Sequence, residues 1–185
     1  MKSTRLAPAF CVVALFASVA PQAALAKLSQ TGTASAQFKD AESVPGAFLT
    51  GTTTRVTLAD DGTTVTLTAQ LESLKTSQSL YDKQLRSTLE VGTYPTASFK
   101  VTRKSLRFLS SRSSASGAAS GSLTLHGATK RVKFKYHATL TNATYRVTLT
   151  ASIDDEEFGV KPPALLGVSY DPEVQLSSTF SAIDR

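Results

Sequence analysis

Few residues of this 185-residue chain could carry out catalysis, and their spacing matches none of the usual sites. His126 precedes a glycine at the end of a predicted strand, where we expect a role in a turn. His137 falls on the polar face of its strand, where we expect it to face solvent. The sequence has no nucleophile elbow, HExxH zinc motif, Walker loop or dinucleotide-binding fingerprint. We therefore predict no catalytic residue and no enzymatic activity.

Metal and cofactor sites are equally hard to place. The only acidic cluster, residues 154–157, lacks the spaced ligands and the glycine of a calcium-binding loop. We interpret it as a solvated turn. The single cysteine, Cys11, lies in the N-terminal segment discussed below. The sequence thus predicts no metal site and no cofactor.

The formal net charge is +6, a modest excess that suits a soluble protein and could also favour anionic headgroups. A nucleic-acid interface would combine basic residues with exposed aromatic rings on one face. Arg131, Lys133 and Lys135 do share one strand face, but no aromatic residue joins them there. We therefore predict that nucleic acid is not a partner.

Residues 1–26 have the pattern of an export signal. Lys2 and Arg5 precede an apolar run over residues 9–20, and Ala24-Leu25-Ala26 provides a cleavage site of small residues. The apolar run is too short to cross a bilayer as a helix. We expect cleavage near Ala26 to release a single domain over residues 27–185, without a cysteine and without stable membrane insertion.

The remaining chain is rich in threonine and alternates apolar with polar residues, as strands with one buried face do. The clearest stretches are 34–39, 53–58, 64–71, 97–102, 120–126, 131–140, 145–153 and 174–182. About eight antiparallel strands must form a sandwich or close into a barrel. Alanines among the large residues of the apolar faces favour a barrel with internal space. We expect the Ser/Gly/Ala-rich residues 110–121 to form a flexible hairpin loop.

One segment has the pattern of a helix, about residues 79–90. Tyr81, Leu85 and Leu89 recur every four residues and form a narrow apolar stripe. Gly92 is expected to end the helix. Such a helix must cover an apolar surface, which in a barrel is the outer face of the sheet or one open end.

Three stretches together resemble the YceI family of exported bacterial proteins: SLKTSQSLYDKQLRSTLEVGTYPTASF (73–99), GSLTLHGATKRV (121–132) and EFGVKPPALLGVSYDPEV (157–174). The resemblance implies an all-β fold, an eight-stranded, lipocalin-like antiparallel β-barrel with a long apolar pocket. It also implies a periplasmic protein that binds a polyisoprenoid, an isoprenoid quinone or a fatty-acid-like lipid. This chain keeps Asp82, but it has Tyr81 and Gln84 where relatives commonly have arginine and histidine.

Under this interpretation the ligand-binding residues are apolar or aromatic and face the barrel interior. We expect the pocket to be lined by Phe38, Val65, Leu67, Tyr81, Leu85, Phe99, Leu123, Leu125, Phe134, Tyr136, Leu149 and Phe180. Tyr81 or Tyr136 would add a polar group near the mouth. The alternative is a structural or stress-related interaction module with a filled barrel and a protein partner. Ligand identity and oligomeric state stay open at this point.

Overall fold

The computed structural model describes residues 26–42, 48–77, 79–110, 113–161 and 170–185. All of the predicted signal peptide except Ala26 lies outside these ranges. The strands are β1 (Leu28–Gln30), β2 (Ala34–Glu42), β3 (Phe48–Asp60), β4 (Thr64–Gln70), β5 (Lys75–Thr76), β6 (Thr96–Thr102), β7 (Ser113–Leu125), β8 (Ala128–Thr141), β9 (Thr144–Asp154) and β10 (Tyr170–Asp184). The helices are α1 (Ser79–Thr88) and the short 3₁₀ turns η1 (Leu71–Ser73), η2 (Arg103–Ser105) and η3 (Glu156–Phe158).

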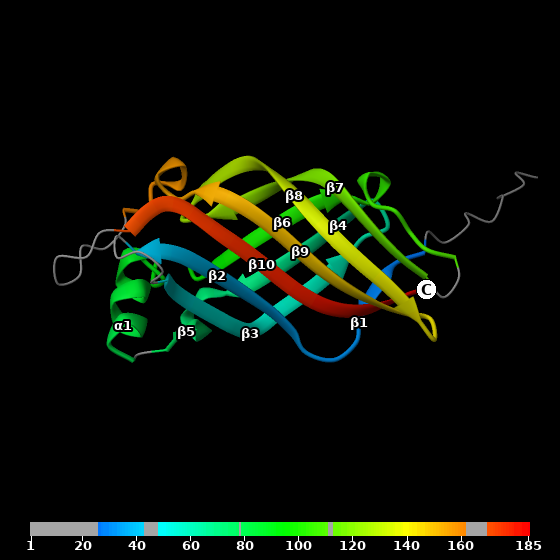
Figure 1. Ribbon diagram of the computed structural model, residues 1–185, viewed down its shortest axis with the longest axis horizontal. Coiled ribbons are helices and arrows are strands. Elements are labelled where there is room, and N and C mark those ends of the chain that lie inside the picture. Colours follow the sequence, from blue (N-terminus) through cyan, green and yellow to red (C-terminus); the bar gives the residue numbers. More distant parts are fainter. Residues whose placement is uncertain (1–25, 43–47, 78, 111–112, 162–169) are drawn as a thin grey trace, which may run out of the picture.

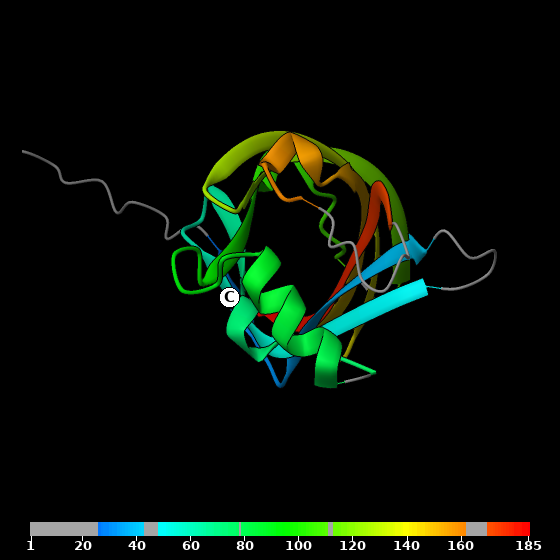
Figure 2. The same cartoon turned by 90° about the vertical axis from the view of Figure 1, so that its left-hand side faces the viewer.

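Eight long strands close into an antiparallel barrel, as predicted. The order around the ring is β10-β2-β3-β4-β6-β7-β8-β9, and β9 pairs again with β10. The short strands β1 and β5 add to β10 and β3. Figure 1 shows the strands running along the length of the molecule, with α1 at one end. Viewed from that end, the strands form a ring and α1 lies across part of it (Figure 2).

The alternation in sequence becomes the two faces of the barrel wall. Along β8, Val132, Phe134 and Tyr136 are buried inside, whereas Lys133 and Lys135 between them are exposed. Successive side chains of a strand point to opposite faces, so one register serves both the core and the solvent.

The Ser/Gly/Ala-rich segment is not a hairpin loop, and that prediction is wrong from Ser113 onward. Residues 113–125 form β7, which pairs with β8 along its whole length. Small residues are needed because large rings pack against this strand. A Cβ atom on Gly117 would lie 2.6 Å from the Tyr136 hydroxyl, and one on Gly121 would collide with the Phe99 ring.

Helix α1 ends earlier than predicted, and Gly92 does not end it. Glu90 has a left-handed backbone conformation, with φ of 45°. The N–H of Val91 donates to the carbonyl of Arg86 (3.1 Å), and the N–H of Glu90 donates to that of Ser87 (3.1 Å). This bonding pattern is a Schellman motif with glutamate in the position usually held by glycine.

The interior contains two clusters of buried side chains. One, near β1 and the start of β2, includes Val56, Tyr145 and Phe180. The other lies at the α1 end and includes Leu85 and Ile153. The second cluster mostly borders the larger cavity described next, whereas the first is divided between that cavity and a smaller one.

Candidate functional site

The larger cavity lies inside the barrel and extends from the middle of the ring to α1. Its volume is about 210 Å³. Its wall is almost entirely aliphatic and aromatic. The apolar lining comprises Ala36, Phe38, Leu49, Val56, Leu67, Ala69, Leu71, Leu74, Tyr81, Leu85, Leu89, Ala97, Phe99, Leu123, Leu125, Val132, Phe134, Leu149, Ala151, Ile153, Val160, Val174 and Leu176.

Alanines on the inward faces create this space. Ala36, Ala69, Ala97 and Ala151 all line the cavity. Ala69 on β4 lies directly opposite Ala97 on β6, so two short side chains meet on adjacent strands. Large side chains there would fill an eight-stranded barrel completely.

A second cavity of about 50 Å³ lies farther from α1. Leu67, Phe99 and Leu149 border both cavities and therefore form the partition between them. The rings of Phe99 and Phe134 meet edge to face, with their centroids 5.0 Å apart. We call Phe99 and Phe134 the aromatic waist. Phe99 borders both cavities, so this pair lies at their junction.

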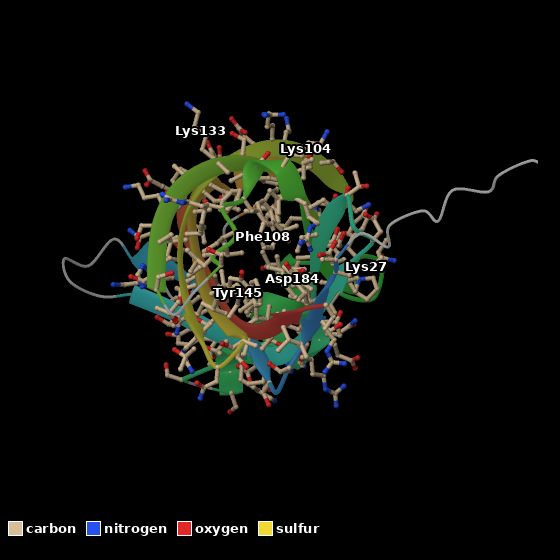
Figure 3. The ribbon with its side chains drawn as sticks, turned by 90° about the vertical axis from the view of Figure 1, so that its right-hand side faces the viewer. Lys27, Lys104, Phe108, Lys133, Tyr145 and Asp184 are labelled. Atoms are coloured by element: carbon tan, nitrogen blue, oxygen red, sulfur yellow. The ribbon has the colours of Figure 1, made fainter. Side chains whose placement is uncertain are left out.

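The end of the barrel opposite α1 is closed by the segment after η2. Phe108 points into the ring of strands beside Tyr145 (Figure 3), and the two rings meet edge to face at 6.2 Å. The N–H of Leu109 donates to the Tyr145 hydroxyl (3.0 Å), which donates in turn to the Leu109 carbonyl (2.6 Å). The N–H of Arg107 donates to the Tyr136 hydroxyl (3.1 Å). Two buried tyrosines thus hold this segment as a plug.

Arg103 fixes the same end. Its guanidinium binds Asp60, whose side chain is fully buried, and both carboxylate oxygens of Asp184 at 2.9 and 3.1 Å. It also lies over the ring of Phe108, 4.1 Å from the centroid. Burial opposes the charge on the guanidinium, but the two carboxylates outweigh it and raise the pKa of Arg103 further above its ordinary value. Arg103 thereby links Asp60, at the end of β3, to Asp184, at the end of β10, through two ion pairs.

At the other end, Asp82 holds α1 against the barrel. Its Oδ1 accepts hydrogen bonds from the N–H of Thr76 (2.6 Å) and from the Thr76 hydroxyl (2.8 Å), and Lys75 Nζ lies 3.4 Å from Oδ2. These bonds, led by the one from the Thr76 backbone, lower the pKa of Asp82. Tyr81, Gln84 and Leu85 of the same helix line the larger cavity. The positions where this chain departs from the YceI pattern therefore lie on the cavity wall.

Two carboxylic acids face the same cavity. Asp40 on β2 and Asp155, just after β9, are 6% and 7% exposed, and they are the only charged residues among the described lining. Oδ1 of Asp155 has no hydrogen-bond partner among the described residues. Burial, followed by the negative charge of Asp154, raises the pKa of Asp155 to about 6. Asp155 belongs to the acidic cluster of residues 154–157. We expected that cluster to be a solvated turn, and this prediction is wrong for Asp155, which is buried.

The twelve residues predicted to line a pocket are divided between the two cavities. The larger cavity is bordered by Phe38, Leu67, Tyr81, Leu85, Phe99, Leu123, Leu125, Phe134 and Leu149. Val65, Tyr136 and Phe180 border only the smaller one. Tyr136 thus lies toward the plugged end, where its hydroxyl binds the backbone of Arg107.

The two acids were missed although the alternation of the strands places them. Asp40 continues the series of inward residues that includes Ala36 and Phe38, and Asp155 continues the series of Ala151 and Ile153. A count of every second residue would have placed both inside the barrel. Their polar type argued against that position, because carboxylates are rarely fully buried.

Two further expectations concern the histidines and metals. His126 occupies the β7–β8 turn with φ of 49°, followed by Gly127 at 76°, so its predicted turn role is confirmed. His137 is exposed on β8, as expected.

Across the residues with assigned positions, no group of three or more histidine, cysteine or acidic side chains could hold a metal ion. No helix within the same ranges is long and apolar enough to cross a membrane.

Comparison with known proteins gives a family and a fold. The model of the YceI-like domain matches residues 23–182. A polyisoprenoid-binding domain from Saccharophagus degradans is similar over 88% of this chain and 100% of its own, with a TM-score of 0.72 and 15% identity. BcnA from Burkholderia cenocepacia is similar over 80% of this chain and 95% of its own, with a TM-score of 0.64 and 15% identity. The comparison with curated proteins gives no relative by sequence.

Proposed function

The chain belongs to the family of YceI-like domains, and from that premise we propose that it binds one long apolar or amphiphilic molecule inside its barrel. The proposed ligands are a polyisoprenoid, an isoprenoid quinone or a fatty-acid-like lipid. The observation that carries the proposal is the cavity of about 210 Å³, whose wall is almost entirely apolar. The structural neighbour from Saccharophagus degradans is itself described as a polyisoprenoid-binding domain.

The energetics suit a carrier and need no catalytic group. Each buried methylene contributes about 0.8 kcal/mol, so a twenty-carbon chain gains roughly 16 kcal/mol of gross burial energy. Association and ordering cost roughly 4–15 kcal/mol of this gain. The remainder, about 1–12 kcal/mol, favours binding by burial without any catalytic group. We therefore propose a binding protein and not an enzyme.

The size of the cavity bears on how the ligand is held. Typical pockets for small molecules measure about 300–1,000 Å³, somewhat more than the 210 Å³ of this cavity. A polyisoprenoid of many units would need further room, past α1 or through the aromatic waist. We propose that its apolar chain lies along the barrel axis and that its head lies at the α1 end.

Export is a separate part of the proposal. The basic residues, apolar run and small-residue cleavage site of residues 1–26 support removal of this segment and a periplasmic or secreted domain. Expression of the full chain, cell fractionation and intact-mass measurement test it. We expect an exported protein that begins at Lys27. A cytoplasmic protein that retains residues 1–26 would contradict export and leave ligand binding untouched.

Ligand binding is tested by filling the cavity. Ala69→Phe adds a ring to the cavity wall, and Thr68→Phe adds the same ring to the preceding residue of β4, which does not line the cavity. We expect organic extracts of the purified protein to contain an apolar molecule by mass spectrometry, and the protein to take up geranylgeraniol. Ala69→Phe should abolish uptake while Thr68→Phe retains it. If neither the protein nor its variants take up prenols, quinones or apolar dyes, the alternative of an interaction module is favoured.

A further inference from the structure

The chemistry of the ligand's head can be inferred from the polar groups at the α1 end of the cavity. The wall offers a long apolar surface but few polar atoms. Among the described lining residues, neither lysine, arginine nor histidine is present, and the charged groups are Asp40 and Asp155. An anionic head such as a phosphate or carboxylate would therefore face negative charge without a cation to balance it.

Asp155 lines the cavity, and the hydrogen bonding of its carboxyl is incomplete. Its backbone is fully engaged: the N–H donates to the Pro172 carbonyl (3.0 Å), and the carbonyl accepts from the N–H groups of Phe158 (3.0 Å) and Val160 (3.2 Å). Asp155 is 7% exposed, and its buried Oδ1 has no hydrogen-bond partner among the described residues. A buried acceptor without a donor costs free energy, which a ligand that supplies the donor would recover.

The groups around Asp155 are mostly acidic as well. Asp154 precedes it on β9, Glu156 follows it in η3, and Glu173 of β10 lies opposite Asp154 in the strand pairing. The nearest histidine, His126, lies beside η3 with its Nδ1 3.3 Å from the carbonyl of Phe158 and its Nε2 3.5 Å from Glu90. The field at this end of the cavity therefore favours a positive or proton-donating group.

We propose that Asp155 is the polar anchor of the cavity and that it selects amphiphiles whose head donates a hydrogen bond, an alcohol or a protonated amine, over amphiphiles with an anionic head. This inference rests on the proposed function, because it assumes that an apolar chain occupies the barrel. The raised pKa of Asp155, about 6, makes the preference depend on pH. Above this pKa, the ionised carboxylate of Asp155 repels an anionic head. Below it, the carboxyl is protonated and this repulsion weakens.

The test uses three amphiphiles with one chain length: tetradecylamine, tetradecan-1-ol and tetradecyl sulfate. The amine and sulfate keep their charges from pH 5 to pH 8, so only protein groups titrate. Displacement of the neutral dye N-phenyl-1-naphthylamine from the domain of residues 27–185 is measured below the micelle concentrations. At pH 8 we expect the amine to displace the dye at a concentration at least about tenfold below that of the sulfate, because a hydrogen bond to a charged group is worth about 1.5–3 kcal/mol.

Two variants assign the effect to one carboxyl. Asp155→Asn should reduce the amine-to-sulfate preference to less than about threefold, whereas Asp154→Asn, on the exposed neighbour, should keep most of it. In the wild-type protein the preference should fall as the pH drops through about 6, which needs no variant. Equal displacement by all three amphiphiles, or an unchanged preference in Asp155→Asn, would overturn the anchor and leave the proposed function standing. Failure of the dye and of all three amphiphiles to bind would overturn the proposed function itself.

Discussion

The buried carboxyl of Asp155 should make the fold less stable at neutral pH than in mild acid, and Asp155→Asn should remove this effect. The pKa is raised from 3.8 to about 6 on folding. Between these values the folded protein holds a proton that the unfolded chain has lost. The contribution to stability is therefore fully present below about pH 3.8 and is lost as the pH rises through about 6. At 1.36 kcal/mol per pKa unit, the full difference is about 3 kcal/mol.

Urea unfolding of the wild type and Asp155→Asn from pH 4 to pH 8 measures this difference. We expect the variant to be more stable by about 1–3 kcal/mol at pH 8, since the buried amide still lacks a partner, and the gap to close towards pH 4. Asp61 and Asp82, whose pKa values are lowered in the fold, act on both proteins equally and cancel in the difference. Asp154→Asn removes only the smaller cause of the raised pKa and should keep most of the pH dependence. A variant that is less stable at pH 8, or a gap that does not change with pH, would refute the reasoning.

Three other substitutions test the waist and the plugged end. Phe99→Ala should join the two cavities, at a cost of about 3 kcal/mol in stability. In the variant, geranylgeraniol should displace the dye more effectively relative to geraniol than it does in the wild type. If the relative effectiveness of the two prenols is unchanged, the waist does not limit ligand length. Arg103→Met should cost about 3–5 kcal/mol, because it leaves the fully buried Asp60 without its cation. Asp184→Asn should cost about 1 kcal/mol, since the side chain of Asp184 is 23% exposed. Equal losses of unfolding free energy in Arg103→Met and Asp184→Asn would contradict this account.

Much of the barrel follows from the alternation of apolar and polar residues. Strands such as β8 have one hydrophobic face, and a one-residue shift would expose all of it. The pattern fails where side chains are small. Gly117 and Gly121 suggest a loop when taken alone, and only the rings of Tyr136 and Phe99, which come from other strands, explain why β7 needs glycine there.

The helix end and the acids were not predictable in the same way. Glycine usually ends a helix, so the sequence favours Gly92 as the end of α1, although the backbone bonds that end the helix form at Glu90. The composition around Asp155 also predicts an exposed position, because four consecutive acidic residues are typical of a solvated turn. The alternation placed Asp155 inside, and its chemical type argued for the surface. Such a conflict between pattern and residue type is where a functional group is to be sought.

The position of β10 in the ring has a consequence for the order of folding. This strand bonds to β9 on one side and to β1 and β2 on the other, and the Ser178 hydroxyl donates to the carbonyl of Ser35, 143 residues away in sequence. Because β10 follows every other strand in the chain, a growing polypeptide cannot complete the ring before it is made. Closure over so long a separation is slow. A nascent chain therefore cannot close the barrel until β10 has been made.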